Sequence, residues 1–163
     1  MNIVVREFNE GDIEQMVEIW NDIVEEGIAF PQMEMLDVHS GLSFFAQQSF
    51  TGIAENSDNN EILGLYILHP NNIGRCGHIS NASYGVKRGC RGMHIGEKLV
   101  SDCLLKAKEL GFRIMQFNAV VSTNYGALRL YEKLGFIKLG IISQGFLMKD
   151  GTYQDIIPHY RLL

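Results

Sequence analysis

The sequence predicts a mixed α/β domain built around one central sheet, and two stretches indicate this class. Residues 84–104 run from an apolar strand through a glycine- and arginine-rich turn into an amphipathic helix. Residues 112–121, FRIMQFNAVV, form a nearly continuous apolar run, which is typical of a strand in a sheet covered on both faces. A strand, a helix and a second strand in this order predict a parallel pair with a right-handed crossover.

The N-terminal part of the chain predicts one strand and two helices. Residues 3–8, IVVREF, indicate a short strand. From Ile13 the apolar positions follow helical spacing until Gly27, which predicts a helix that ends at a glycine. A loop interrupted by Pro31 follows, and a second helix is expected over residues 37–48.

The middle of the chain predicts a hairpin, a third strand and the helix of the opening stretch. Residues 50–56 and 61–68 flank the polar turn cluster SDNN, which is a hairpin signal. After a longer connection, residues 78–86 form the strand that leads into the glycine-rich turn. The helix is expected from about residue 95, because its apolar residues form one stripe that stops before Gly111.

The C-terminal part predicts one more helix and two closing strands. The sequence STN at 122–124 offers a helix cap, and the helix that follows is expected to stop at Gly135. Residues 136–143 and 154–163 are the closing strands, and the Asp-Gly pair at 150–151 indicates a turn between them.

Composition restricts the class of protein. Lys and Arg number 14 against 19 Asp and Glu, and the net charge of −5 argues against a nucleic-acid surface. Three cysteines without framework spacing indicate reduced thiols. No signal-peptide pattern and no run of about 18 apolar residues is present. We therefore expect a single cytoplasmic domain, residues 1–163, that binds neither nucleic acid nor a membrane.

The turn within residues 84–104 has the features of a phosphate-binding loop. The first amides of a helix lack acceptors, and the helix dipole adds roughly half a positive charge at that end. Arg91 adds a full positive charge at the same place. Neither the G-x-G-x-x-G pattern of a Rossmann site nor the Gly-Lys-Ser/Thr of a Walker loop is present.

Two separated motifs resemble those of the GNAT superfamily of acyl-CoA-dependent N-acetyltransferases. The stretch VKRGCRGMHIG at 86–96 is similar to the family's strand end followed by Arg/Gln-x-x-Gly-x-Gly, and Arg91 and Gly96 match. The stretch NYGALRLYEKLGF is similar to the family's second motif. Its matching residues are Asn124, Ala127, Tyr131, Gly135 and Phe136. With the element order, the resemblance covers nearly the whole chain. It implies a central mixed sheet of about 6–7 strands with a splayed parallel pair and helices on both faces.

The resemblance implies acetyl-CoA as co-substrate and no metal. The pyrophosphate is expected to bind to Arg91 and to the amides of residues 92–97. The pantetheine arm is expected to lie between the end of the strand at residues 84–86 and Asn118. Gly85 is expected to permit a strand bulge, and the amide of Val86 to stabilise the oxyanion. The implied cofactor contacts are Tyr84, Gly85, Val86, Arg91, Gly92, Met93, His94, Ile95, Gly96, Glu97, Asn118, Asn124 and Tyr131.

His94 is the main departure from the family pattern, which has glycine at this position. A Cβ atom there causes strain if φ is positive. The backbone amide remains, and a protonated imidazole would favour a phosphate. We therefore expect His94→Gly to keep or improve the affinity for acetyl-CoA.

Two residues are candidates for roles in catalysis. Tyr131 matches the position of the family's general acid, which protonates the departing thiolate. It also lies on an apolar helical stripe, so an ordinary core tyrosine is the alternative. Asn81 lies on a strand where many family members carry a glutamate. Its amide can orient an amine or a water molecule, but it cannot act as a base.

The sequence does not identify a single residue as the general base that removes a proton from the amine. His78, Asp155, and Glu25 or Glu26 acting through water are the candidates, whereas His159 is expected to be structural. The cysteines offer no stronger alternative. Cys76, His78, Cys90 and His94 match no zinc spacing, and Cys90 has no accompanying base for nucleophilic catalysis.

The expected function is transfer of an acetyl group from acetyl-CoA to a small-molecule amine by direct attack. Acidic residues around the acceptor side favour an amino-acid-like or cationic amine. One alternative is acetylation of a protein or peptide N-terminus or lysine. Another is a non-catalytic module that binds acyl-CoA. The family resemblance also makes a homodimer possible.

Overall fold

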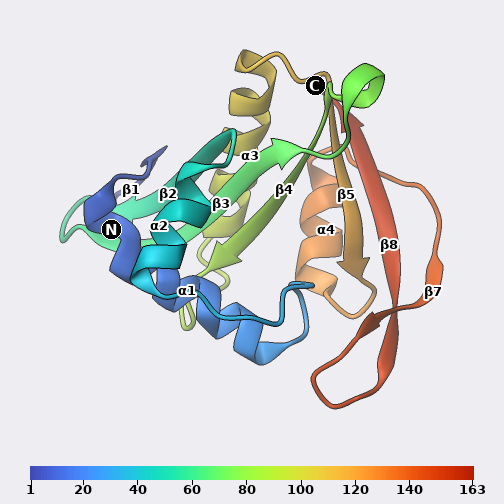
Figure 1. Ribbon diagram of the computed structural model, residues 1–163, viewed down its shortest axis with the longest axis horizontal. Coiled ribbons are helices and arrows are strands. Elements are labelled where there is room, and N and C mark those ends of the chain that lie inside the picture. Colours follow the sequence, from blue (N-terminus) through green and yellow to red (C-terminus); the bar gives the residue numbers. More distant parts are fainter.

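A single eight-stranded mixed sheet forms the centre of the computed structural model, which describes residues 1–163. The strands are β1 (Ile3–Glu7), β2 (Phe50–Asn56), β3 (Glu61–Pro70), β4 (Ile79–Val86), β5 (Ile114–Val121), β6 (Ile137–Lys138), β7 (Ile142–Leu147) and β8 (Tyr153–Leu162). Their order is β1-β2-β3-β4-β5-β8-β6, and β7 also pairs with β8. Only β4 and β5 are parallel, as predicted (Figure 1).

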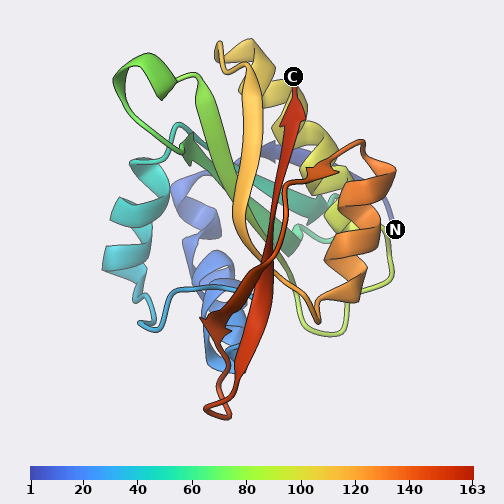
Figure 2. The same cartoon turned by 90° about the vertical axis from the view of Figure 1, so that its right-hand side faces the viewer.

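Four α-helices cover the two faces of this sheet, as predicted. They are α1 (Ile13–Glu26), α2 (Val38–Ala46), α3 (Ile95–Glu109) and α4 (Tyr125–Lys133). Helices α1 and α2 lie on one face and α3 and α4 on the other (Figures 1 and 2). Side chains alternate across the strands, so Leu65 packs with α1 while its neighbour Tyr66 packs with α3. None of the helices is both long and apolar enough to cross a bilayer.

The parallel strands β4 and β5 separate soon after they meet. They pair only at Ile79 with Ile114 and at Ser80 with Met115. Beyond these two positions the strands diverge, which confirms the splayed parallel pair. The sheet therefore contains a gap in its middle, and the backbone groups along this gap are free for a ligand.

The bulge beside the gap lies in β5. Between Phe117 and Val120 the register with β8 shifts, so that Asn118 and Ala119 together oppose Pro158. Proline has no N–H to donate, which explains why the ladder is interrupted there. The expected bulge at Gly85 is wrong, because the β3–β4 register is continuous through that residue.

Gly85 lies in close contact with α1. A Cβ atom on this residue would lie 2.7 Å from Cδ1 of Ile23, a distance that side chains do not reach without a shift. The missing side chain lets α1 pack closely on the edge of β4. The glycine therefore positions the C-terminal part of α1 beside the gap.

The C-terminal segment differs from the prediction of one strand over residues 136–143. It forms the two-residue strand β6 and then β7, separated by residues 139–141. Gly140 lies at φ 145°, which only glycine adopts readily, so a continuous strand cannot pass through it. The sheet therefore has eight strands where the sequence predicted about six or seven.

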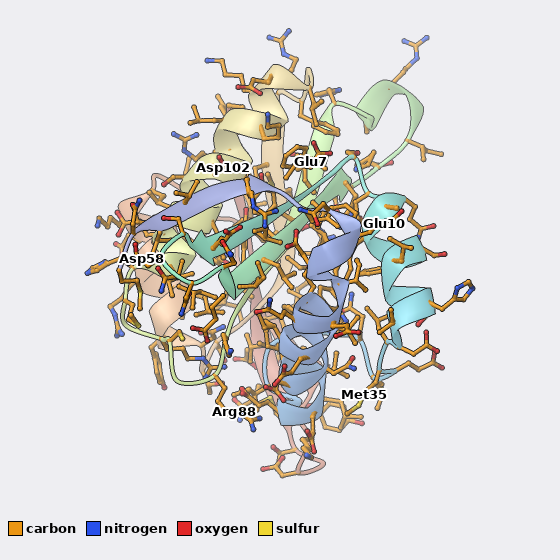
Figure 3. The ribbon with its side chains drawn as sticks, turned by 90° about the vertical axis from the view of Figure 1, so that its left-hand side faces the viewer. Glu7, Glu10, Met35, Asp58, Arg88 and Asp102 are labelled. Carbon is orange, nitrogen blue, oxygen red and sulfur yellow. The ribbon has the colours of Figure 1, made fainter.

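The turn between β4 and α3 lies at the same end of the molecule as the C-terminus of α1. Arg88 of this turn is labelled at that end in Figure 3. Gly27 ends α1 in the left-handed conformation, as predicted, and its carbonyl accepts a 3.0 Å hydrogen bond from the amide of Lys149. The end of α1 is therefore fixed between the turn and the β7–β8 hairpin.

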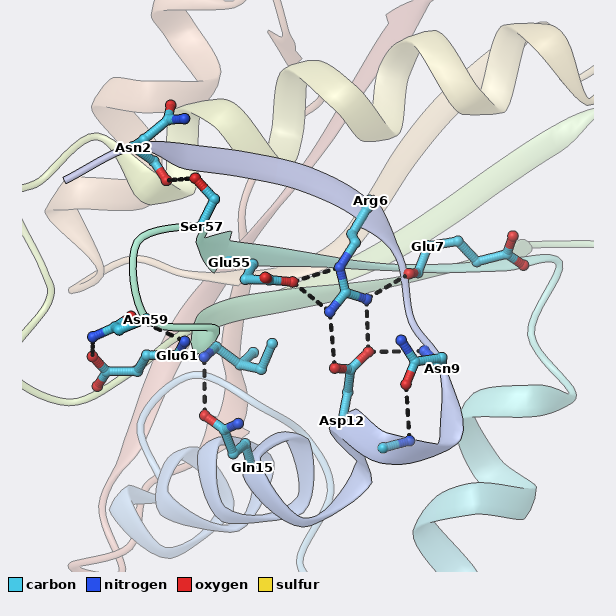
Figure 4. Close-up of polar contacts among 12 residues, drawn as sticks. Asn2, Arg6, Glu7, Asn9, Asp12, Gln15, Glu55, Ser57, Asn59 and Glu61 are labelled. Carbon is cyan, nitrogen blue, oxygen red and sulfur yellow. Dashed lines mark hydrogen bonds and ion pairs between the residues drawn. The ribbon is translucent and has the colours of Figure 1, made fainter.

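At the opposite end of α1, Arg6 joins three elements (Figure 4). Its guanidinium donates to both carboxylate oxygens of Asp12, over 2.8 and 3.0 Å, and also to Glu55 of β2. Burial by itself would raise the pKa of Asp12. The hydrogen bonds from Arg6 and the amide of Asn9 outweigh burial and lower it. This network attaches the start of α1 to β1 and β2.

Candidate active site

The gap between β4 and β5 opens into two adjoining cavities. We call the smaller one the inner pocket; its volume is about 200 Å³, and Asn81, Ser83, Asn118 and Tyr131 contribute to its lining. We call the larger one the outer groove; its volume is about 1040 Å³, and it runs along the β4–α3 turn and the start of α4. Both cavities share Ala29, Tyr84, Asn124 and Ala127, so one ligand can occupy both.

The edge of β4 presents backbone amides to the gap. Two 2.8 Å hydrogen bonds, from Asn71 N to Ile79 O and from Lys87 N to Leu63 O, frame the β3–β4 ladder. In an antiparallel pair, the backbone N–H and C=O groups of every second residue bond to the neighbouring strand. In β4 the backbone groups of the odd-numbered residues therefore bond to β3. The amides of Tyr84 and Val86 therefore point toward the gap, where β5 has already departed. This orientation is the one required of the predicted oxyanion donor at Val86.

The β4–α3 turn carries an unusual run of free amides. None of the seven consecutive backbone N–H groups of residues 91–97 donates to an acceptor within the protein. Asp37 and Asn124 cap α2 and α4 with their side chains, whereas His94 at the start of α3 makes no such bond. An uncapped helix start after a glycine-rich turn fits an anion with several oxygen atoms, such as a pyrophosphate.

His94 adopts φ 59°, which is the left-handed conformation that glycine favours. Since φ is positive and the residue carries a Cβ atom, His94 strains the backbone at the position where the family has glycine. The imidazole is largely exposed, with Nδ1 3.5 Å from the carboxylate of Glu97. It leaves the amides of the turn open.

The arginines of the turn are already paired in this structure. Nη2 of Arg91 donates over 2.9 Å to Glu26, the last residue of α1, and Nη2 of Arg88 lies 3.7 Å from the same carboxylate. Glu97 in the first turn of α3 is held by Lys133 over 2.7 Å, which lowers the pKa of Glu97. The amides of the turn, and not an unpaired guanidinium, thus form its free anion-binding groups.

Most of the predicted cofactor contacts line one of the two cavities. The residues in the outer groove are Tyr84, Val86, Arg91, Gly92, His94, Ile95, Gly96, Glu97 and Asn124. Gly85 and Met93 line neither cavity. Tyr84 can contribute only through its main chain, because its ring packs between Tyr66 and Phe117 and its hydroxyl is buried without a partner.

Tyr131 reaches the inner pocket from α4. Its ring packs on Phe117, with centroids 4.6 Å apart, and its hydroxyl makes no hydrogen bond within the protein. Burial, and secondarily the nearby Cys103, raises its pKa well above the ordinary value for tyrosine. The phenol therefore stays protonated, as a general acid requires. The ring of Tyr131 is therefore packed against the core while its hydroxyl reaches the pocket. The residue can be both a core tyrosine and a general acid.

The side chain of Asn118 is exposed and finds its partner on the connection that follows β3. Its Nδ2 donates over 2.7 Å to Oδ1 of Asn71, which also accepts from Nδ2 of Asn81 over 3.2 Å. Asn71 follows β3 in the chain and was not singled out in the sequence, since it lies in a connection without a motif. It bridges β4 and β5 where they stop pairing.

One backbone amide determines which side-chain atoms donate and which accept in the hydrogen bonds among Asn81, Asn71 and Asn118. The amide of Ala82 can only donate, so the atom of Asn81 that accepts from it over 2.8 Å must be Oδ1. The other side-chain atom, Nδ2, then requires an acceptor on Asn71, and the oxygen of Asn71 in turn requires a donor on Asn118. Asn81 thereby accepts a hydrogen bond from the amide of Ala82, which has no partner on β5 because the two strands have separated there.

None of the candidate bases lines either cavity. Glu26 is bound to the arginines, Asp155 accepts from the amide of Gln144, and His78 and Glu25 lie elsewhere on the surface. The inner pocket contains no charged side chain and no histidine.

His159 is almost fully buried beside Tyr131. Its Nδ1 lies 2.6 Å from the carbonyl of Ile157, and burial lowers its pKa. No three His, Cys, Asp or Glu side chains gather closely enough to hold a metal ion.

The match to known proteins agrees with this geometry. Residues 13–136, more than half of the chain, match the profile of the acetyltransferase (GNAT) family. The chain belongs to the GNAT family. The resemblance inferred from the two sequence motifs is thereby confirmed.

Curated relatives differ in how much of their length the chain covers. N-acetyltransferase aca1 of Schizosaccharomyces pombe is 38% identical over 101 residues, which is 61% of this chain and 48% of that protein. The chain thus spans about half of this relative. "Putative phosphinothricin acetyltransferase YwnH" of Bacillus subtilis is 26% identical over 151 residues, 89% of this chain and 90% of that protein.

Solved GNAT structures match nearly the whole chain. A GCN5-related N-acetyltransferase from Kribbella flavida superposes with a TM-score of 0.90 at 30% identity, covering 99% of this chain and 98% of that one. A phosphinothricin acetyltransferase from Sinorhizobium meliloti, solved in complex with acetyl-CoA, has a TM-score of 0.90 at 20% identity, covering 100% of this chain and 89% of that one. The fold is therefore that of the GNAT family.

Proposed function

We propose that this GNAT chain transfers the acetyl group of acetyl-CoA to the amine of an amino-acid-like small molecule. The observation that carries the proposal is the presence of two groups of free backbone amides beside the same groove. One group is residues 91–97 at the start of α3, and the other is Val86 and Tyr84 along the gap. A pyrophosphate fits the first group, and the amide-bearing pantetheine arm fits the second.

In the proposed reaction the thioester lies in the gap, and the nitrogen of the amine attacks its carbonyl carbon from the inner pocket. A C–N bond forms, and the C–S bond breaks as the tetrahedral intermediate collapses. The amide of Val86 or Tyr84 donates to the oxyanion. The phenol of Tyr131 gives its proton to the departing thiolate, and the phenolate is then reprotonated by the second proton that the attacking nitrogen releases as the amide forms.

The amine loses its proton to solvent in this proposal, because no carboxylate or histidine lines the inner pocket. Only the neutral amine is a nucleophile. We therefore expect kcat/KM to rise with pH up to the pKa of the amine itself. A profile that instead levels off near pH 6.5 would indicate a histidine base.

Two observations support an amino-acid-like acceptor. The walls of the inner pocket are neutral, which offers no counter-charge for a polycation. YwnH, the curated relative that matches along almost its whole length, is named for phosphinothricin, an amino acid. We infer the same chemical class for this chain.

The decisive experiment combines calorimetry with an assay of thiol release. Acetyl-CoA is titrated into the protein, and turnover is then measured with amino acids including phosphinothricin, with polyamines and with peptides that have a free N-terminus. Turnover with amino acids supports the proposal. Turnover with peptides alone favours the protein N-acetyltransferase, and saturable binding without turnover favours an acyl-CoA-binding module. Absence of binding rejects all three.

A further inference from the structure

The salt bridge between Arg91 and Glu26 connects the β4–α3 turn, which lines the outer groove, with the end of α1. Arg91 belongs to this turn, and Glu26 is the last residue of α1, whose Ile23 lines the groove together with Ile28. The Nη2–Oε2 distance is 2.9 Å across 65 positions of sequence. A ligand that enters the groove beside the turn therefore meets a closed ion pair.

Glu26 uses a hydrogen-bonding group that a phosphate would use. A guanidinium N–H that donates to a carboxylate cannot donate in the same direction to a phosphate oxygen. The carboxylate and a pyrophosphate also carry charges of the same sign and repel each other at short distance. The pair between Arg91 and Glu26 must therefore open, or at least lengthen, when a pyrophosphate binds at the amides of residues 91–97.

The carboxylate is more deeply buried than the two arginines that pair with it. The side chain of Glu26 is only 19% exposed, whereas those of Arg91 and Arg88 are both 61% exposed. The backbone next to Glu26 is fixed by Gly27, which bonds to Lys149 and has no room for a side chain. A bound phosphate would thus draw the arginines away from the more buried carboxylate.

We propose that Glu26 is an internal competitor for the cofactor's pyrophosphate. Before binding, its carboxylate is paired with Arg91 and Arg88 beside the groove. On binding, the arginines exchange this carboxylate for phosphate oxygens. The proposal rests on the proposed function, because it takes acetyl-CoA as the ligand of the groove. It makes Glu26 a residue that lowers cofactor affinity, and no change in the reacting atoms is involved.

Glu26→Gln tests the proposal, with Glu25→Gln as the matched control. Glu25 is exposed, forms no ion pair and lies one position earlier in the same helix, so both substitutions change the net charge equally. Glu26→Gln is expected to bind acetyl-CoA about three- to tenfold more tightly, since exposed ion pairs contribute up to about 1 kcal/mol and loss of repulsion adds to this. Glu25→Gln is expected to match the wild type.

A second ligand separates competition from a structural effect. S-acetyl-pantetheine carries the thioester but no phosphate, so its affinity is expected to be the same in the wild type and in Glu26→Gln. The gain for acetyl-CoA is also expected to be smaller in an Arg91→Gln background, where only the pair with Arg88 and the charge repulsion remain. Calorimetry measures both affinities, and circular dichroism confirms that each variant is folded.

Three results would overturn the proposal. The first is unchanged or weaker acetyl-CoA binding by Glu26→Gln, and the second is an equal gain for both ligands. Either result leaves the proposed function intact, because the wild type still binds acetyl-CoA. The third is a lack of acetyl-CoA binding in every variant, which would reject the proposed function and this inference together.

Discussion

At the scale of single residues, Tyr131 is the side chain most directly suited to chemistry. It combines an unpaired hydroxyl at the inner pocket with a ring that is held by Phe117 and Phe136. Burial raises its pKa, so that the phenol can donate a proton throughout the pH range of ordinary assays. The packing thus orients the hydroxyl and keeps it protonated.

Tyr131→Phe is expected to lower kcat while leaving the affinity for acetyl-CoA within about twofold of the wild type. Loss of a general acid typically costs about 10²–10⁴-fold in rate. The apolar ring remains, so the core packing is retained. Steady-state kinetics with calorimetry measures both effects, and full turnover by the variant would exclude the proposed role.

A second prediction at this scale concerns His94, whose positive φ strains any residue with a Cβ atom by about 1–2 kcal/mol. His94→Gly is expected to maintain or improve both thermal stability and acetyl-CoA affinity. His94→Ala retains the Cβ atom and is expected to be less stable than His94→Gly. Thermal unfolding and calorimetry compare the three proteins. A large loss of affinity in His94→Gly would instead show that the imidazole binds the cofactor.

At the scale of elements, the gap in the sheet is framed at its closed end by side chains from three segments. Pro158 of β8 imposes the bulge in β5, and the bulge places Asn118 where it reaches Asn71. Asn71 in turn bonds to Asn81 of β4. The spacing between β4 and β5 where they separate thus depends on Asn71, which belongs to neither strand.

Asn71→Ala is expected to lower the free energy of unfolding by about 1 kcal/mol, because both bridging hydrogen bonds are lost. The acetyl-CoA affinity should fall as well, since β4 and β5 are no longer joined. Asn71→Asp keeps an acceptor oxygen for both amides and is expected to behave like the wild type. Urea unfolding and calorimetry test this. Equal behaviour of the alanine and aspartate variants would argue against the bridge.

At the scale of the whole molecule, Arg6, Asp12 and Glu55 join the first strand, the first helix and the hairpin at the end opposite the β4–α3 turn. The pKa of Asp12 is lower in the folded protein than in the unfolded chain. The stability that this carboxylate contributes is therefore present above its unfolded pKa of about 3.9 and is lost as the pH falls through its lower folded value.

Asp12→Ala is expected to lower the free energy of unfolding at pH 7 by about 2 kcal/mol, because charged hydrogen bonds to Arg6 are lost. The variant should also show a smaller loss of stability between pH 5 and pH 3 than the wild type. Glu10→Ala is the control, since Glu10 is exposed in the same turn and makes no side-chain bond. Urea titrations across pH measure this, and parallel pH curves for Asp12→Ala and the wild type would contradict it.

The elements of this protein followed largely from local patterns. The helices α1, α3 and α4 lie where apolar spacing and glycine stops predicted them, because helical hydrogen bonds join residues four positions apart. The free amides of the β4–α3 turn were also foreseeable, since an uncapped start after glycines is visible in the sequence. The break at residues 139–141 was missed because the sequence shows Gly140 but not its φ of 145°, which it adopts between the stretches where β6 and β7 pair with β8.

By itself the sequence determined the order of the elements, the uncapped glycine-rich start of α3 and the tyrosine of α4. Only the tertiary structure decided which side chains meet in the gap. The pairs Arg91–Glu26 and Asn118–Asn71 are separated by 65 and 47 positions. Contacts of this kind depend on sheet register and helix docking, which sum many weak packing preferences, and no local pattern in the chain specifies them.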